Sequence, residues 1–172
     1  VSGARAGSRL YDGSVNAMLD LRQAALVGVA GGDAVALNVA GAKGVFADKK
    51  AGAGKTVFVS GLTLVGADAG EYSLAQPTTT GDIVAKPLTA NMISAANKAY
   101  DGTTAATLNL GQAVLEGVIG ADSVALNTAY AVGSFQTPSV GAAKAVRISN
   151  LGLVGGDAGN YSLTEPTLTA DI

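Results

Sequence analysis

The feature that most constrains this chain is an internal duplication. Shifted by 89 positions against itself, the segment 9–83 pairs with 98–172 without a gap, and about 41 of the 75 paired residues are identical. Because no insertion separates the two copies, each copy is expected to be a closed structural unit. We therefore predict two domains, residues 1–85 and 86–172, each of which must build its own small core.

Composition narrows what such a unit can be. Charged residues make up 14% of the chain, against roughly 25% in a typical soluble domain, and there are 24 glycines. Cysteine is absent, so neither disulfides nor thiolate metal sites can hold the fold, and packing alone must do so. The net charge is −2 and the pI is about 4.9, which offers no basic surface for a phosphate backbone. Nucleic acid is excluded as an expected partner.

The chain is apolar enough to raise the question of a membrane, since 48% of its residues are hydrophobic. The most apolar window, 24–42, is interrupted by Asp33, Asn38 and several glycines, whereas a spanning helix needs roughly 18 uninterrupted apolar residues. No membrane insertion is expected. Residues 1–8 lack the charged and then apolar order of a signal peptide, which favours an internal piece of a longer polypeptide.

Alternating apolar and polar residues predict strands in each unit, and no window carries a sustained helical stripe. In the second unit, 123–135 alternates throughout, and 145–154 alternates with a phase shift at Ser149 and Asn150 that suggests a bulge or a bend. The linker 86–98 is predicted to be the first strand of the second unit, with Leu88, Ala90 and Met92 on one face. Its counterpart, residues 1–10, shows no such alternation, and two interpretations stay open: this end is frayed, or its first residues are foreign to the natural protein.

The sharpest local pattern is Asp-Ala-Gly-x-Tyr-x-Leu, which occurs twice. It begins at Asp68 and Asp157 and places Tyr72 and Tyr161 four residues later. The pattern resembles the tyrosine corner of immunoglobulin-like domains, where a Tyr hydroxyl ties the turn before a late strand back to the backbone. Leucine then stands where antibody domains have their second cysteine. This resemblance implies an all-β fold of two tandem immunoglobulin-like β-sandwich modules, joined by a short strand-like linker.

A second duplicated pattern is Tyr-Asp-Gly, for which two interpretations compete. It comprises Tyr11, Asp12 and Gly13 in the first copy and Tyr100, Asp101 and Gly102 in the second. The tyrosines either anchor a tight turn or stack on sugars at the surface. Asp-Gly is a strong turn dipeptide, so we favour the anchor. Tyr130 has no tyrosine counterpart in the first copy, where Gly41 stands, and it is the candidate for a ligand contact specific to one module.

Catalytic chemistry finds little support in the residues present. Without His or Cys, only serine–lysine, paired-carboxylate or metal–carboxylate schemes remain. The carboxylates present in both copies lie beside Gly or Ala in turn-like contexts, where Asp side chains accept hydrogen bonds from nearby backbone amides. They are Asp12/Asp101, Asp33/Asp122, Asp68/Asp157 and Asp82/Asp171. We expect turn roles, no cofactor and no enzymatic activity. Calcium ligation is the lesser alternative, because the dense acidic run typical of calcium sites is absent.

The duplicated lysines Lys55 and Lys144 raise two further hypotheses. Residues 53–56 resemble the end of a phosphate-binding loop, but Lys49 stands where that loop requires glycine, and the second copy lacks Gly54. An isopeptide bond from each lysine to Asn38 or Asn127 would also need a carboxylic acid in an apolar pocket. Loss of ammonia in the intact mass would test for that bond.

Three stretches together carry a family resemblance. They are 98–107 (KAYDGTTAAT), 117–126 (GVIGADSVAL) and 149–163 (SNLGLVGGDAGNYSL), and all three have counterparts in the first copy. They resemble the YDG-type repeats of large secreted and surface proteins of bacteria, which include filamentous haemagglutinin-like adhesins exported by two-partner secretion and related immunoglobulin-like repeats. The resemblance implies an extracellular, non-enzymatic repeat that acts as a stalk or spacer in adhesion or biofilm formation, with neighbouring repeats as partners. The alternative is a module that binds polysaccharide or host glycan.

Overall fold

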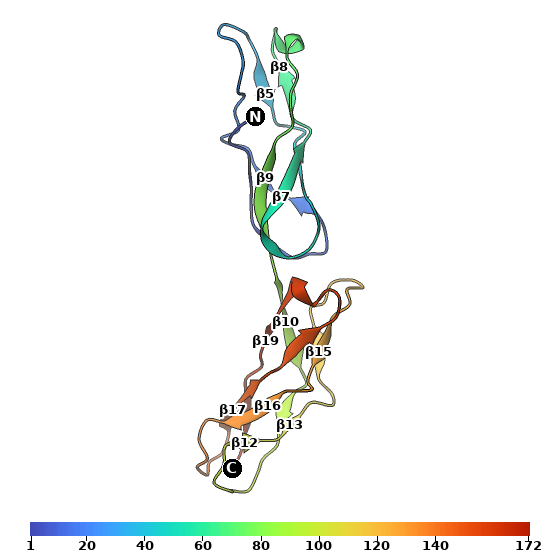
Figure 1. The fold of residues 1–172 in the computed structure, drawn as a ribbon. Helices are drawn as coiled ribbons and strands as arrows, with labels where there is room; N and C mark the ends of the chain where they lie inside the picture. Colours follow the sequence, from blue (N-terminus) through green and yellow to red (C-terminus); the bar gives the residue numbers. More distant parts are fainter. The chain divides into compact units, whose positions relative to one another are not determined.

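The computed structural model describes residues 1–172 and is built from short β-strands, with two 3-10 turns, η1 (Ala69–Glu71) and η2 (Ala158–Asn160), and no α-helix (Figure 1). The prediction of an all-β fold is confirmed. The chain divides into two compact units, Val1–Ala85 and Lys86–Ile172, which we call unit 1 and unit 2. The structure contains no helix that is long and apolar enough to cross a membrane.

Unit 1 is organised around a five-stranded sheet in the order β2-β9-β7-β6-β3. Its strands are β1 (Arg5–Ala6), β2 (Arg9–Leu10), β3 (Asn16–Ala17), β4 (Leu19–Asp20), β5 (Ala36–Asn38), β6 (Lys43–Phe46), β7 (Gly52–Ser60), β8 (Thr63–Val65) and β9 (Thr78–Val84). Strand β2, at one edge of this sheet, pairs in parallel with its neighbour β9, and the other neighbouring strands pair antiparallel. Two smaller pairs, β1-β4 and β5-β8, complete the unit.

The two long central strands of unit 1 show why these residues form strands. In β7, Val57 and Val59 are buried while Phe58 between them is exposed, as expected where successive side chains point to opposite faces. Ile83 of β9 is buried in the same way. Strands β7 and β9 lie side by side in Figure 1 and are paired along most of their length, with a register shift between Gly52 and Lys55.

Unit 2 has a four-stranded sheet, β12-β16-β17-β20, and a three-stranded sheet, β14-β10-β19. Its strands are β10 (Lys86–Asn91), β11 (Ser94–Ala95), β12 (Ala105–Ala106), β13 (Leu108–Asn109), β14 (Val114–Glu116), β15 (Ala125–Asn127), β16 (Val132–Phe135), β17 (Lys144–Ser149), β18 (Gly152–Val154), β19 (Tyr161–Thr164) and β20 (Leu168–Ala170). The core of unit 2 joins Ala90 of β10 to Phe135, Val146 and Ile148 of the four-stranded sheet.

The linker prediction is confirmed for its first six residues and wrong beyond them. Residues 86–91 form β10, which belongs to unit 2, and Leu88 and Ala90 are buried as expected. Met92 adopts a positive φ of 59° and is exposed, while Ile93 turns inward. Because Met92 is in the left-handed conformation, the side chains that follow it face the opposite way. The alternation that the sequence shows across Met92 therefore does not continue in the structure.

Two other strand predictions need correction. The segment 123–135 is two strands, β15 and β16, because a turn in which the Ala131 amide donates to the Thr128 carbonyl interrupts it. Residues 1–10 are not frayed, since Ser2 bridges to Ala25 and both β1 and β2 are paired. The phase shift in 145–154 is confirmed: Asn150, at φ 58°, separates β17 from β18.

Candidate functional site

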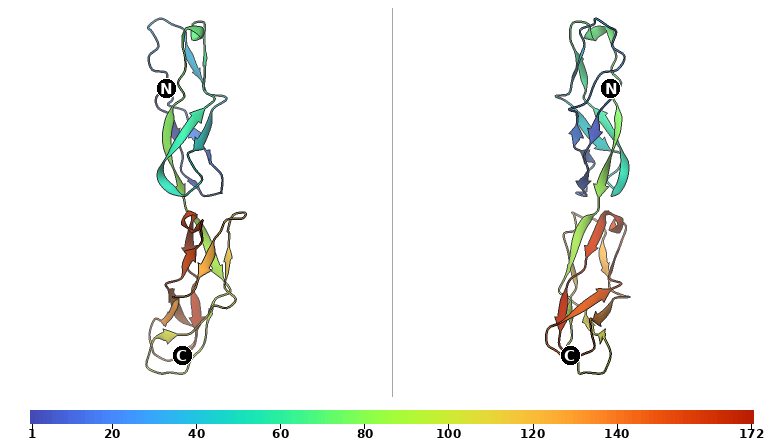
Figure 2. Two further views of the ribbon diagram at one scale, coloured as in Figure 1. Left: turned by 45° about the vertical axis from the view of Figure 1, so that its right-hand side comes forward. Right: turned by 90° about the vertical axis from the view of Figure 1, so that its left-hand side faces the viewer.

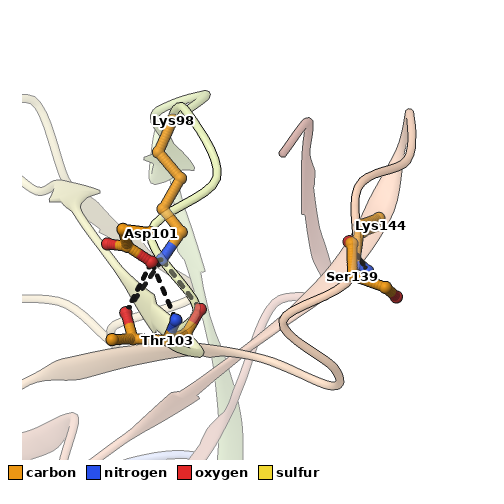
Figure 3. Close-up of polar contacts among 5 residues, drawn as sticks. All are labelled: Lys98, Asp101, Thr103, Ser139 and Lys144. Carbon is orange, nitrogen blue, oxygen red and sulfur yellow. Dashed lines mark hydrogen bonds and ion pairs between the residues drawn. The ribbon is translucent and has the colours of Figure 1, made fainter.

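The Tyr-Asp-Gly turn of unit 2 is held together by a lysine (Figure 3). Lys98 Nζ lies 2.7 Å from Asp101 Oδ1 and donates to the carbonyl and the hydroxyl of Thr103 at 2.9 and 3.0 Å. Asp101 also accepts from the Thr103 backbone amide at 2.8 Å. The hydrogen bond from Lys98, followed by that from the Thr103 amide, lowers the pKa of Asp101 to about 2. Every donor of the lysine is used within the turn.

Unit 1 builds the same turn with an arginine. Arg9 forms an ion pair with Asp12 and donates from Nη2 to the Ser14 carbonyl at 2.5 Å. Burial would raise the pKa of Asp12, but the hydrogen bonds from the Ser14 amide and from Arg9 outweigh it and lower that pKa below its usual value. Arg9 and Lys98 are paired in the duplication, so the cation is a shared part of the turn although the residue type differs.

Both cations also lie over a buried aromatic ring. The guanidinium carbon of Arg9 is 5.4 Å from the centroid of the Phe46 ring, and Lys98 Nζ is 5.8 Å from that of Phe135. Both distances are within the range of an attractive cation–π contact. Each turn is therefore fastened to the core of its unit through the cation, a role that the sequence did not reveal because Arg9 and Lys98 are not identical.

The two tyrosines of these turns have different environments. Tyr11 is 1% exposed and its amide donates to the Val84 carbonyl at 2.8 Å, whereas Tyr100 is 62% exposed. The expectation that both tyrosines anchor their turns does not hold for Tyr100. In unit 2 the turn is held by Lys98 and Thr103 instead. Gly13 and Gly102 take φ values of 78° and 77°, the left-handed conformation that favours glycine in this turn.

The Asp-Ala-Gly-x-Tyr segment of unit 2 is tied to a distant loop. The Tyr161 hydroxyl accepts from the Ile119 amide at 3.0 Å and donates to Asp122 Oδ2 at 2.7 Å. Asp157 Oδ2 accepts from the Ser123 amide at 2.9 Å. Two side chains on either side of η2, Asp157 and Tyr161, thus fasten the loop 119–123 to the motif.

Unit 1 repeats this clamp. The Tyr72 hydroxyl accepts from the Ala30 amide at 3.0 Å and donates to Asp33 Oδ2 at 2.5 Å, and Asp68 Oδ2 accepts from the Ala34 amide at 2.8 Å. The bond to Asp33 raises the pKa of Tyr72. As in a tyrosine corner, the hydroxyl bonds to a backbone amide, but that amide lies 42 positions earlier in the chain, so the contact joins two loops of the unit.

In each unit, an aspartate fastens the loop that precedes Lys55 or Lys144. Asp82 Oδ1 accepts from the Gly54 amide at 2.8 Å, and Asp171 Oδ1 accepts from the Ala143 amide at 2.7 Å. Lys55 pairs with Asp48 at 2.7 Å, which lowers the pKa of Asp48. A phosphate-binding loop directs its backbone amides at the ligand, but here the Gly54 amide is already bonded to Asp82. The geometry therefore does not favour a phosphate site.

Lys144, the counterpart of Lys55, donates to the hydroxyl of Thr137 at 2.9 Å. It also bonds to Ser139, which lies beside it in Figure 3. The asparagines of the isopeptide hypothesis are engaged elsewhere: Asn38 Oδ1 accepts from the Ala40 amide and Asn127 Oδ1 from the Ala129 amide. The structure gives both lysines and both asparagines other partners, so the geometry does not favour an isopeptide bond.

The duplicated carboxylates are thus scattered over three separate fastenings. The prediction that they accept from nearby backbone amides holds for Asp12 and Asp101. It is wrong for the other three pairs, Asp33/Asp122, Asp68/Asp157 and Asp82/Asp171, which accept from groups 28 to 39 positions away in the chain. No group of three or more His, Cys, Asp or Glu could hold a metal ion. Tyr130, the candidate ligand contact, lies in the turn between β15 and β16 and is 75% exposed. Its ring is the most exposed aromatic surface that belongs to one copy alone.

Fold and contacts together define a class of protein: a duplicated all-β unit whose shared aspartates, and whose Tyr72 and Tyr161 hydroxyls, fasten its loops and turns. The model of the YDG domain matches residues 1–80 and again residues 84–169. The chain belongs to the YDG domain family, with one domain in each unit. A search of curated proteins and a search of solved structures each returned no match.

Proposed function

We propose that the chain is a non-enzymatic repeat segment of a large secreted or cell-surface bacterial adhesin of the filamentous haemagglutinin-like type, where it serves as a stalk or spacer in adhesion or biofilm formation. The observation that carries the proposal is that the aspartates and the Tyr72/Tyr161 hydroxyls shared by the two copies all fasten loops and turns. The Asp101, Tyr161 and Asp171 fastenings each recur in unit 1. The contacts that the two copies share are therefore structural, as a spacer built from repeats requires.

The proposal includes an immunoglobulin-like sandwich as the scaffold of each unit. Its support comes from unit 2, where Ala90 from the sheet β14-β10-β19 shares one core cluster with Phe135, Val146 and Ile148 from the sheet β12-β16-β17-β20. Two sheets that bury their inner faces against each other form a sandwich. The absence of cysteine suits this scaffold, because packing replaces the disulfide between the sheets.

The spacer function is testable by surface display. A terminal binding domain is anchored to a bacterial surface directly or through one or two copies of residues 1–172, and capture of ligand-coated beads is measured. Capture is expected to rise with copy number, as the domain is carried away from the surface. A matched variant with Phe135→Asp, which disrupts the core of unit 2, should lose part of the gain. Capture that is independent of copy number would overturn the proposal.

The alternative function is recognition of an extracellular polysaccharide or host glycan, and the exposed Tyr130 favours it. Aromatic rings that stand free of the core offer a flat apolar surface with a polar tip. A glycan array probed with residues 1–172 separates the two functions. A spacer gives no saturable binding, whereas saturable binding that is lost in Tyr130→Ala and kept in Tyr130→Phe would favour the glycan-binding module.

A further inference from the structure

The short strand pair β1-β4 of unit 1 carries charged side chains beside a pocket. Arg5 and Asp20 stand directly opposite each other in this antiparallel pair, which belongs to the blue segment of Figure 2, so their side chains lie on the same face. The pocket has a volume of about 470 Å³ and a mostly polar lining, made by Gly3, Arg5, Asp20, Arg22 and Gln23. Its size is within the range of about 300 to 1,000 Å³ that small-molecule sites have.

One of the two arginines of the pocket is held in a fixed orientation. Arg22 donates from Nε to Asp20 Oδ1 at 2.9 Å and from Nη2 to Asp20 Oδ2 at 2.7 Å. The side-chain hydrogen bond from Arg22 is the main cause that lowers the pKa of Asp20 to about 2, so this carboxylate is ionised at neutral pH. A guanidinium has five N–H groups, and those on Nη1 of Arg22 stay available to a ligand.

The other arginine makes no such contact. Arg5 is exposed and takes part in no side-chain hydrogen bond or ion pair, and it acts on Asp20 only through the attraction of opposite charges. All five of its N–H groups can therefore serve a ligand. Because two arginines face one aspartate, the pocket carries a net positive charge.

The matched strand pair of unit 2 forms without any of these charges. The counterparts of the five pocket residues are all uncharged: Met92, Ser94, Asn109, Gly111 and Gln112. Strands β11 and β13 pair in the same register as β1 and β4, and Asn109 Nδ2 donates to Ser94 Oγ at 3.2 Å. The fold therefore does not require the charges of unit 1, which leaves binding as their role.

The donors and the acceptor in the pocket suit a sugar that carries a carboxylate. Arginine binds carboxylates through parallel, charge-assisted N–H···O bonds, and Arg5 is free to make them. Asp20 Oδ2 accepts one hydrogen bond and keeps a second lone pair, which can accept from a sugar hydroxyl. The Gln23 amide can both donate and accept. An acidic amino acid side chain would bring the carboxylate but no hydroxyl for Asp20.

We propose that this pocket binds an acidic polysaccharide through one uronic acid residue, with Arg5 and Arg22 on the carboxylate and Asp20 on a hydroxyl of the sugar. Asp20 is also the positioning residue for Arg22. The proposal rests on the alternative function given above, recognition of polysaccharide or glycan. It adds a ligand class and a site in unit 1 that does not involve Tyr130.

The test titrates residues 1–172 with trigalacturonate at physiological salt and follows backbone amide signals by NMR. Saturable shifts are expected at 3–5 and 20–23, and none at the counterparts 92–94 and 109–112. Two control ligands are expected to bind at least about tenfold more weakly: the methyl ester of the trisaccharide, which lacks the charge, and triglutamate, which lacks the hydroxyls. Equal affinity for either control, or no shift at 3–5 and 20–23, would overturn the proposal.

Substitutions separate a built site from a general attraction between charges. Arg5→Gln is expected to weaken binding at least about tenfold. Lys43→Gln removes the same charge from an exposed lysine outside the pocket lining and should leave the affinity unchanged. Asp20→Asn makes the pocket more positive, so charge alone predicts tighter binding, whereas the proposal predicts weaker binding because Arg22 loses its partner. Equal losses in Arg5→Gln and Lys43→Gln, or tighter binding by Asp20→Asn, would refute the site.

A last variant distinguishes this site from the contact at Tyr130. Tyr130→Ala is expected to bind trigalacturonate as the unaltered chain does. Binding that is lost in Tyr130→Ala and kept in Arg5→Gln would support glycan recognition at Tyr130 and overturn the site in unit 1.

Discussion

At the scale of single residues, the two copies differ most in how they make left-handed turns. Unit 2 has three residues other than glycine with positive φ, and each is paired in the duplication with a glycine of positive φ in unit 1. The pairs are Met92 with Gly3, Ala143 with Gly54 and Asn150 with Gly61. An L-residue with a side chain pays roughly 1–2 kcal/mol in this conformation, so unit 2 carries strain that unit 1 avoids.

The pair Ala143 and Gly54 gives the cleanest test, because a side chain at Gly54 would meet nothing within 4 Å. Gly54→Ala is expected to destabilise unit 1 by about 1 kcal/mol, and Ala143→Gly to stabilise unit 2 by about 0.5 kcal/mol, since relief of strain exceeds the added entropy of the unfolded chain. Urea unfolding measures both. Ala142→Gly, at a neighbouring residue without positive φ, should destabilise; a gain there would contradict the explanation.

The Asp101 carboxylate makes unit 2 sensitive to acid. Its pKa is about 2 in the folded chain, against an ordinary value of 3.8. A lowered pKa means that the carboxylate stabilises the folded state above about pH 4 and that this contribution is lost as the pH falls towards 2. The unfolding temperature of unit 2 should fall more steeply between pH 4 and 2 in the unaltered chain than in Asp101→Asn. Parallel pH profiles for the two would show that the turn contributes nothing.

At the scale of elements, the fold depends on clamps between loops and on small residues within strands. The hydroxyl of Tyr161, at the start of β19, joins that strand to the loop 119–123, and no strand pair does this. In the sheets, Gly44 of β6 and Gly133 of β16 lie under leucines: an added side chain would meet Leu19 or Leu108 at 2.7 Å. These glycines are needed for close approach, and not for a turn.

Removing the Tyr161 hydroxyl isolates the clamp. Tyr161→Phe is expected to destabilise unit 2 by about 1–3 kcal/mol, because the Ile119 amide loses its acceptor in a part of the unit where Tyr161 is buried. Thermal or urea unfolding measures the change. Tyr130→Phe alters the same hydroxyl on an exposed ring and should leave stability unchanged; an equal loss in both variants would refute the clamp.

The close approach at Gly133 predicts a packing effect. Gly133→Ala is expected to cost about 1–3 kcal/mol, because the new methyl group overlaps Leu108 Cδ2 and the Ala106 carbonyl, both at 2.7 Å. Gly156→Ala is the control, since nothing lies within 4 Å of its added side chain and its φ is not positive. Unfolding of unit 2 by urea compares them. A neutral Gly133→Ala would mean that β12 and β16 can separate without cost.

At the scale of the whole molecule, the chain is two units that differ in strand pairing. Unit 2 includes β10 and pairs it on both sides, with β14 and β19. In unit 1, residues 73–75, the counterparts of 162–164 in β19, belong to no strand ladder. The division at Ala85 and Lys86 places β10 in unit 2, the unit to which the sequence pattern assigns the segment that begins at Lys86.

This difference predicts unequal stabilities for the separate units. A fragment of residues 86–172 is expected to fold alone with one cooperative transition, and a fragment of residues 1–85 to unfold at a lower temperature, because residues 73–75 there have no ladder partner. Calorimetry of both fragments and of the full chain measures this. A more stable 1–85 fragment, or an unfolded 86–172 fragment, would contradict the assignment of β10.

The sequence by itself determined the duplication, the all-β class and the positions of the Tyr-Asp-Gly turns, because these follow from residue identity and local alternation. It also located the duplicated Asp and Tyr side chains. It missed the turns at Met92 and at 128–131, where apolar and polar residues continue to alternate. Tertiary structure decided where these side chains bond: Tyr72 and Tyr161 reach loops 42 positions away, a separation that no local pattern encodes. The packing of β10 likewise depends on β14 and β19, which lie far along the chain, so only the folded molecule shows where Leu88 is buried.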